Sequence, residues 1–180
     1  MATATKTKDR EAAADTAPNQ TERTKNDTPA NAKQVSIDVL NATLADGIDL
    51  YNATRQAHWN VKGPRFHSLH ELFQQFYEEL QTGTDDIAER VLALGGTAVG
   101  TSQVVAESTR LPPYPTDLKA GEDHLKALIE RYGQVANAMR EGIEETDEAG
   151  DAVTSDLLTE QVALMDKRLW MLESFLQSDR

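Results

Sequence analysis

Four side chains of types that bind metal ions occur at spacings that one chain cannot bring to a single ion. They are His58, His70, Asp85 and Glu89. If residues 66–95 form one helix, the 15 positions from His70 to Asp85 separate the two residues by roughly 22 Å, at about 1.5 Å of rise per residue. A site that uses all four side chains would therefore need two chains.

The four side chains fall into two local pairs. Asp85 and Glu89 stand at i and i+4, so they share one helix face and could hold one cation together. His58 ends one predicted helix and His70 begins the next, so a bend at Gly63 and the following proline could bring the imidazoles together. A second chain packed antiparallel across a two-fold axis would then bring the histidines of one chain to the carboxylates of its mate.

Two imidazoles and two carboxylates suit Fe(II), Mn(II) or Zn(II), and an open coordination position favours redox iron over a closed structural zinc. The chain contains no cysteine, which excludes disulfides and thiolate metal sites. Taken singly, each pair also has an ordinary explanation. Glu89 is next to Arg90 and could form an exposed charge pair with it. A single histidine more often has a structural role than a metal-binding one.

Apolar residues at three- and four-residue intervals predict two long helices around these positions. The first covers about 35–61, the second about 66–95, and glycines at 63, 95 and 96 mark their ends. The stripe of the first helix is Ile37, Leu40, Leu44, Ile48 and Tyr51, and that of the second is Phe66, Leu69, Phe73, Phe76, Leu80, Ile87, Val91 and Leu94.

In the second half of the chain, the residue pattern predicts a long connection followed by two more helices. Residues 96–120 contain Gly100 and three prolines, which exclude one continuous helix but allow a short one from Ser102 to Ser108. Stripes around 125–143 and 158–176 follow, divided by Gly150, with Asp151 as the expected N-cap. No segment shows a strand pattern. The prediction is an all-α, ferritin-like four-helix bundle with one long crossover.

Composition sets the domain organisation. The 180 residues are 39% hydrophobic, which suits one domain of ordinary size. Residues 1–33 contain no aliphatic side chain larger than Ala after Met1, so we expect a disordered tail there and the bundle at 34–180. No apolar run is long enough for a membrane span or a secretory signal, which favours a cytoplasmic protein.

The acidic charge lies almost entirely in the predicted bundle. The net charge is −12, and residues 1–33 carry six basic and five acidic groups, so residues 34–180 carry about −13. Such a field repels nucleic-acid phosphates and attracts cations. The near-neutral tail could still contact DNA, which would make the protein nucleoid-associated. Strong acidity with only eight lysines also predicts adaptation to high intracellular salt.

A longer motif links these positions. It reads His58-Trp59-Asn60-Val61-x-Gly63-x-x-Phe66-x-x-Leu69-His70, then Phe73, Tyr77, Asp85, Ile87 and Ala88-Glu89-Arg90, with a late Asp166-Lys167-x-Leu169-Trp170-x-Leu172-Glu173 segment. It resembles the Dps family, the ferritin-like "DNA-binding protein from starved cells" proteins, and a haloarchaeal member in particular. The resemblance covers about residues 34–178.

This resemblance implies a hollow dodecameric shell with ferroxidase centres at two-fold interfaces. His58 and His70 of one subunit and Asp85 and Glu89 of the other would bind iron, with Trp59 beside them as a radical interceptor. Fe(II) would be oxidised, preferentially by hydrogen peroxide, and stored as a ferric mineral, which limits Fenton damage to DNA. No organic cofactor is expected beyond Fe(II) and Fe(III).

The chain also departs from the family pattern. Gln74 stands where many members carry an aspartate that helps to bind a second iron, so a full di-iron centre is in doubt. Gln75 is also neutral, which leaves Glu71 as the first candidate for mineral nucleation, followed by Glu78 and Glu79. The resemblance also implies acidic pores through which iron enters the shell. Candidates for lining such a pore are Asp147, Glu148, Asp151 and Asp156, which could equally be solvated charges or helix caps. His67 and His124 match no family role and are expected on the helix surface, although His67 could be an auxiliary iron contact.

Three other interpretations remain open from the sequence. A ferritin or bacterioferritin is disfavoured, because no histidine here has Glu three residues before it. A DNA-coating protein would rely on tail residues such as Lys6, Lys8 and Arg10, whose charge nearby acids nearly cancel. A purely structural oligomer would assemble without consuming peroxide.

Overall fold

Five helices make up the part of the chain that the structure, a computed structural model, describes, which is residues 21–177. They are α1 (Ala30–Asn60), α2 (Phe66–Ala93), α3 (Ser102–Ser108), α4 (Gly121–Ala149) and α5 (Ala152–Ser174). The only extended pairing within 21–177 is one bridge between Lys62 and Ala120. The predicted all-α bundle with a long crossover and a short third helix is confirmed.

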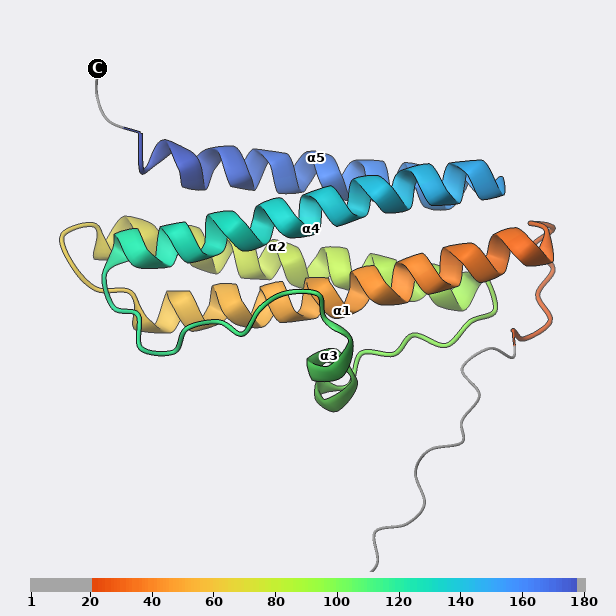
Figure 1. Cartoon of the computed structure of the whole chain (residues 1–180), viewed down its shortest axis with the longest axis horizontal. Coiled ribbons are helices and arrows are strands. Elements are labelled where there is room, and N and C mark those ends of the chain that lie inside the picture. Colours follow the sequence, from red (N-terminus) through yellow and green to blue (C-terminus); the bar gives the residue numbers. More distant parts are fainter. Residues whose placement is uncertain (1–20, 178–180) are drawn as a thin grey trace, which may run out of the picture.

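The long helices form two antiparallel pairs, α1 with α2 and α4 with α5 (Figure 1). The crossover returns along the bundle and carries α3 against α1, so that α4 starts at the same end as α2. A buried carboxylate fixes this connection to α1, because Asp46 accepts hydrogen bonds from the backbone N–H and the guanidinium of Arg110. The crossover is thus held by polar contacts as well as by apolar packing.

The core lies between the two pairs and contains most of the residues that the periodicity predicts, although Phe66 of the second stripe is exposed. Tyr132, Phe73 and Phe76 are its largest fully buried side chains. The Tyr132 hydroxyl shares a hydrogen bond of 3.3 Å with that of Thr54, which satisfies a polar group that would otherwise be costly to bury. Burial raises the pKa of Tyr132 well above its ordinary value, so this phenol stays neutral.

The N-terminal boundary differs from the prediction. α1 begins at Ala30 rather than at 35, and residues 21–29 contact the bundle, with Glu22 N–H donating to the Gly95 carbonyl at 2.7 Å. The predicted start of the first helix at 35 is therefore too late by five residues. The disordered tail predicted at 1–33 stays a prediction, and residues 1–20 lie outside the described part. The cause is polar, since the side chains of Thr24 and Asn26 accept hydrogen bonds from backbone N–H groups two residues ahead and replace the missing apolar contacts.

The turn between α4 and α5 matches the prediction in detail. Gly150 adopts φ 92°, which favours glycine, and Asp151 accepts from the Thr154 N–H as the N-cap of α5. The carboxylate also accepts from Ser36 of α1 and Arg90 of α2. Burial alone would raise the pKa of Asp151, but the hydrogen bonds from Thr154 and Ser36 and the charge of Arg90 outweigh it and hold the pKa below its ordinary value.

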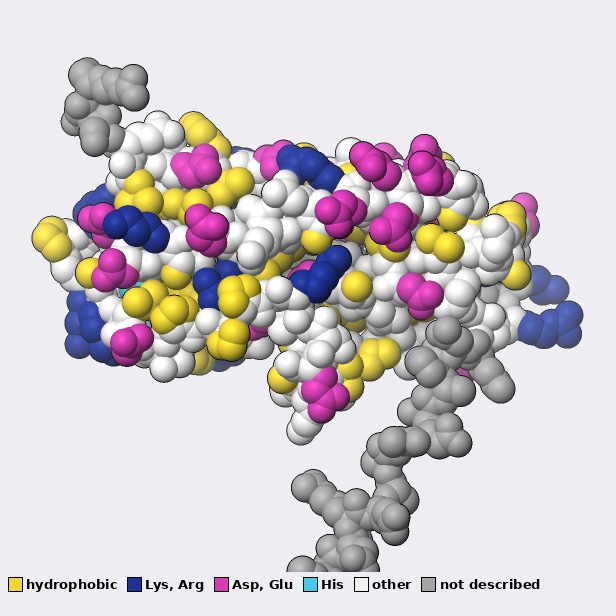
Figure 2. All heavy atoms as spheres, viewed as in Figure 1, with side chains coloured by type: hydrophobic (Ala, Val, Ile, Leu, Met, Phe, Trp, Pro, Cys, Tyr) yellow, Lys and Arg dark blue, Asp and Glu magenta, His cyan; other side chains and the backbone are white. Residues whose placement is uncertain are grey.

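Acidic side chains are spread over α4 and α5 on the face in Figure 2, and Lys and Arg side chains lie at both ends and in the middle of that face. No helix in the described part of the chain is long and apolar enough to cross a membrane.

Candidate metal centre

His58 and His70 lie against each other where α1 ends and α2 begins. Their rings are stacked, with centroids 3.8 Å apart and planes inclined by 19°. The bend between the helices contains Gly63, whose φ of 112° is one that favours glycine. The predicted proximity of the two imidazoles is confirmed.

Each ring is held by the backbone of the other residue. The Nδ1 of His58 lies 2.8 Å from the carbonyl oxygen of His70, and the Nδ1 of His70 lies 2.8 Å from the carbonyl oxygen of His58. Because a carbonyl oxygen only accepts, both Nδ1 atoms must carry the hydrogen. In the neutral rings each Nε2 then keeps its lone pair, which is the tautomer that binds a metal.

Aromatic side chains surround this pair. The ring of Tyr77 meets His58 edge-on at 5.3 Å, and Phe66 lies 5.1 Å from His70. Tyr51 in turn packs edge-on against Tyr77 at 5.9 Å. His58 is 8% exposed and His70 is half-buried, so both imidazoles are largely shielded from solvent in the single chain.

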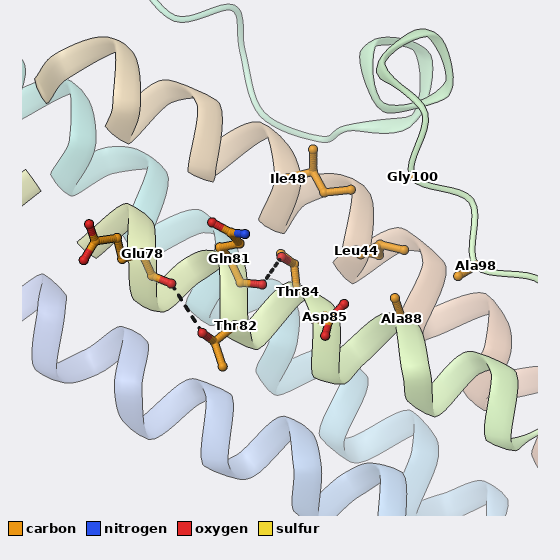
Figure 3. A pocket seen from close by; sticks show the side chains of 10 residues that line it. All are labelled: Leu44, Ile48, Glu78, Gln81, Thr82, Thr84, Asp85, Ala88, Ala98 and Gly100. Atoms are coloured by element: carbon orange, nitrogen blue, oxygen red, sulfur yellow. Dashed lines mark hydrogen bonds between the residues drawn. The ribbon is translucent and has the colours of Figure 1, made fainter. Parts of the chain in front are cut away.

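Asp85 and Glu89 are exposed on α2, farther along the chain from the histidines. Asp85 lines a groove of about 750 Å³ between α1 and α2, with Leu44 and Ile48 on the α1 side. Figure 3 shows these side chains beside the segment of Ala98 and Gly100. Within residues 21–177 no three His, Asp or Glu side chains converge on one point. The histidine pair and the carboxylate pair therefore lie apart as two candidate half-sites, and a metal site that uses all four side chains stays a prediction.

The remaining predicted residues have other partners. Glu71 lies 3.4 Å from exposed His67, and Gln74 donates to Glu78 at 2.8 Å. Gln75 donates to Glu79 at 2.8 Å, and Glu79 also pairs with buried Arg168 at 2.9 Å. The pore candidates that are exposed are Asp147, Glu148 and Asp156. The carboxylate of Asp151 is buried and accepts hydrogen bonds from Ser36, Thr154 and Arg90, an arrangement that does not suit a pore ligand.

His124 is not on the surface. It is 1% exposed, and its Nδ1 shares a 2.7 Å hydrogen bond with the Tyr114 hydroxyl. Burial holds the pKa of His124 below its ordinary value. The surface prediction is therefore wrong for His124, because the crossover folds back over the first turn of α4.

Sequence reasoning did not single out the cluster of Tyr51, Arg55 and Tyr77. The Arg55 guanidinium donates to the Tyr51 hydroxyl at 3.2 Å and lies 4.6 Å from the ring centre of Trp59. The signal was present in the spacing, since Tyr51, Arg55 and His58 follow one another at four and three residues on a single helix face.

Comparison with known proteins agrees with this architecture. The family model of the ferritin-like domain matches residues 37–180. The DNA protection during starvation protein of Agrobacterium fabrum is 52% identical over 158 residues, which are 88% of this chain and 98% of that protein.

Solved structures give the same result. A Dps protein from Vibrio cholerae O1, described as a member of a broad superfamily of ferritin-like diiron-carboxylate proteins, superposes with a TM-score of 0.77 at 29% identity, over 81% of this chain and 91% of that one. An archaeal Dps homologue from Halobacterium salinarum gives a TM-score of 0.80 at 28% identity, over 84% of each chain.

Bundle topology and the family model define a ferritin-like protein. Within that class, the relatives and the solved structures are Dps proteins at high coverage, and the chain belongs to the Dps family. A haloarchaeal source remains a prediction.

Proposed function

We propose that the protein is a ferroxidase and iron-storing mini-ferritin whose centres form between two subunits. The observation that carries this proposal is the reciprocal hydrogen bonding of His58 and His70, which leaves both Nε2 lone pairs available for a metal ion. Fe(II) is the substrate, and hydrogen peroxide is the preferred oxidant.

The two half-sites on each chain support a shared centre. The histidine pair lies at one end of the α1–α2 face, and Asp85 lies in the groove farther along that face. Antiparallel docking of a second copy on this face would bring the partner's carboxylates to the imidazoles and repeat the arrangement across the two-fold axis. The carboxylates would offset the charge gained as iron becomes ferric, while neutral imidazoles limit how tightly the product is held.

Membership of the Dps family supports a proposal for assembly and storage. We propose twelve subunits around a cavity that holds the ferric mineral, with iron entering near exposed Asp147, Glu148 and Asp156 and nucleating at Glu71. The relative from Agrobacterium fabrum is named for protection of DNA during starvation. For this chain we propose protection by removal of Fe(II) and peroxide, because the acidic bundle repels phosphates.

Mixed assemblies test the shared centre. One chain carries His58→Ala and His70→Ala, the other Asp85→Ala and Glu89→Ala, and the two are unfolded together and reassembled. Random pairing makes half of the dimers mixed, and each mixed dimer has one complete centre of two, so we expect about a quarter of wild-type Fe(II) oxidation. The measurement is ferric absorbance after anaerobic Fe(II) loading and peroxide addition.

The control is Asp86→Ala, which removes an exposed carboxylate next to Asp85 and should retain full oxidation. A mixture no more active than either parent, with assembly intact, would contradict the shared centre. Iron that precipitates outside the oligomer in the wild-type protein would contradict storage and favour a DNA-coating role.

A further inference from the structure

Tyr77 is the redox-active side chain in direct contact with the histidine pair. Its ring meets His58 edge-on, with centroids 5.3 Å apart and planes at 76°. Tyr51 continues the contact at 5.9 Å and 89°. Edge-to-face rings at these distances touch without a gap. An unbroken aromatic path therefore leads from a metal-binding ring to two phenols.

The composition of the centre creates a need for an electron donor. Reduction of hydrogen peroxide to water takes two electrons, and one Fe(II) supplies only one. At the position one turn after His70 the chain has Gln74, whose amide is engaged with Glu78, so the ligand set favours a single iron. A lone Fe(II) without a second donor would release a hydroxyl radical.

Electrostatics distinguish Tyr77 from the neighbouring Trp59. The Arg55 guanidinium lies 4.6 Å from the ring centre of Trp59, and a positive charge on the ring face opposes removal of an electron from it. The same cation donates to the Tyr51 hydroxyl. Among the described residues no Lys or Arg stacks on Tyr77. Trp59 is also 60% exposed, whereas Tyr77 is half-buried.

We infer that Tyr77, in contact with His58, supplies the second electron when peroxide oxidises a single Fe(II) at the centre. This inference rests on the proposed function. The O–O bond breaks, Fe(II) loses one electron to become Fe(III), and Tyr77 loses one electron and its phenolic proton. With one further proton from solvent, both peroxide oxygens leave as water, and a neutral tyrosyl radical remains.

A later Fe(II) restores the phenol. It gives one electron to the tyrosyl radical, which takes a proton from solvent and becomes Tyr77 again, and a second Fe(III) is formed. The sum is two Fe(II) oxidised for each peroxide, without a second metal position.

The test uses the assembled full-length protein, loaded anaerobically with one Fe(II) per centre and mixed with peroxide. Freeze-quench paramagnetic resonance should show a tyrosyl radical that narrows when ring-deuterated tyrosine is incorporated. Tyr77→Phe should abolish this signal and release hydroxyl radical to the spin trap. With the trap in excess over Fe(II), so that the radical does not oxidise a second Fe(II), the Fe(II) oxidised per peroxide should halve. Tyr51→Phe should keep the signal, because the Arg55 cation over the Tyr51 ring opposes removal of an electron from Tyr51.

Tyr114→Phe is the matched control, because it deletes a phenolic hydroxyl whose partner is His124 rather than the histidine pair. An unchanged radical in Tyr77→Phe, or a radical lost only in Trp59→Phe, would overturn the inference while leaving the ferroxidase intact. A wild-type protein that oxidises no Fe(II) would overturn the proposed function and this inference together.

Discussion

At the scale of single residues, the backbone fixes the orientation of both imidazoles of the histidine pair, which suits the proposed binding of a metal ion. Each Nδ1 hydrogen bond ends on the backbone of the opposite helix terminus, so ring orientation is set by the bend between α1 and α2. Such fixed orientation lowers the entropy lost when the ligands bind a metal. The ligands on the carboxylate side lack this restraint, because Asp85 and Glu89 are exposed in the single chain.

Gln74→Asp should convert the centre to one that binds two irons. An aspartate there lies one turn from His70 on the same face of α2, and it replaces an amide that now donates to Glu78. We expect the number of Fe(II) ions bound per centre to double, measured by anaerobic calorimetric titration. With two irons, peroxide receives both electrons from metal, so the tyrosyl radical should decline in the same variant.

The neighbouring Gln75→Asp makes the same change of charge one residue away, where the amide donates to Glu79 instead. It should leave the binding stoichiometry unchanged. An equal increase in both variants would mean that added negative charge, rather than a specific ligand position, draws in the second iron.

At the scale of elements, Asp151 joins three helices. It caps α5 and accepts from Ser36 of α1 and Arg90 of α2, and it is 2% exposed. Removal of one partner of a buried ion pair leaves the other charge uncompensated. The carboxylate of Asp151 therefore holds α1, α2 and α5 together in this chain. The local sequence around Asp151 could not distinguish this role from that of a pore ligand.

Asp151→Ala should lower the free energy of unfolding by about 3–5 kcal/mol, since it removes a buried charge partner and a helix cap. The measurement is urea unfolding at fixed protein concentration. Asp166→Ala is the control, because its pair with Arg140 is exposed and should cost at most about 1 kcal/mol.

The pH dependence gives a second check on Asp151. Its folded pKa is depressed, so its stabilisation is fully present above the ordinary aspartate pKa of about 3.9 and is lost as pH falls through the folded pKa. Asp151→Ala should therefore flatten the loss of stability at acid pH relative to the wild type. A variant with the parent's full acid dependence would show that other carboxylates control it.

The elements were predictable because they depend on local patterns. The spacing of apolar residues predicts the four long helices, and glycines mark where helices end. The prolines predict the long crossover. The start of α1 was not predictable in this way, because Thr24 and Asn26 satisfy the backbone by hydrogen bonds that apolar periodicity does not record.

The candidate site was predictable in part. The i and i+4 carboxylates and the histidines around Gly63 follow from spacing, whereas the Nδ1 hydrogen bonds and the contact of Tyr77 with His58 depend on how α1 packs against α2. The burial of His124 depends on the crossover, which joins residues distant in sequence.

At the scale of the whole molecule, charge opposes assembly. Each added chain brings a formal charge of −12, and the acidic side chains cover much of α4 and α5 (Figure 2). Repulsion between subunits extends over a screening length of about 10 Å at 0.1 M salt and about 3 Å at 1 M. A shell of many such chains is therefore expected to depend on salt, which fits the predicted adaptation to high intracellular salt.

Assembly should increase with salt for this reason. We expect small oligomers at about 0.05 M NaCl and complete shells at about 1 M, as the screening length falls below the spacing of surface charges. Sedimentation velocity across a salt series measures the distribution. The triple variant Glu130→Gln, Glu144→Gln and Glu145→Gln removes three exposed charges from α4 and should assemble at lower salt.

Screening predicts equal effects of chloride and sulfate at equal ionic strength, whereas a much stronger effect of sulfate would indicate exclusion of salt from the protein surface. Complete shells of unchanged stability at 0.05 M NaCl would contradict the salt adaptation, because the repulsion would then be too weak to matter.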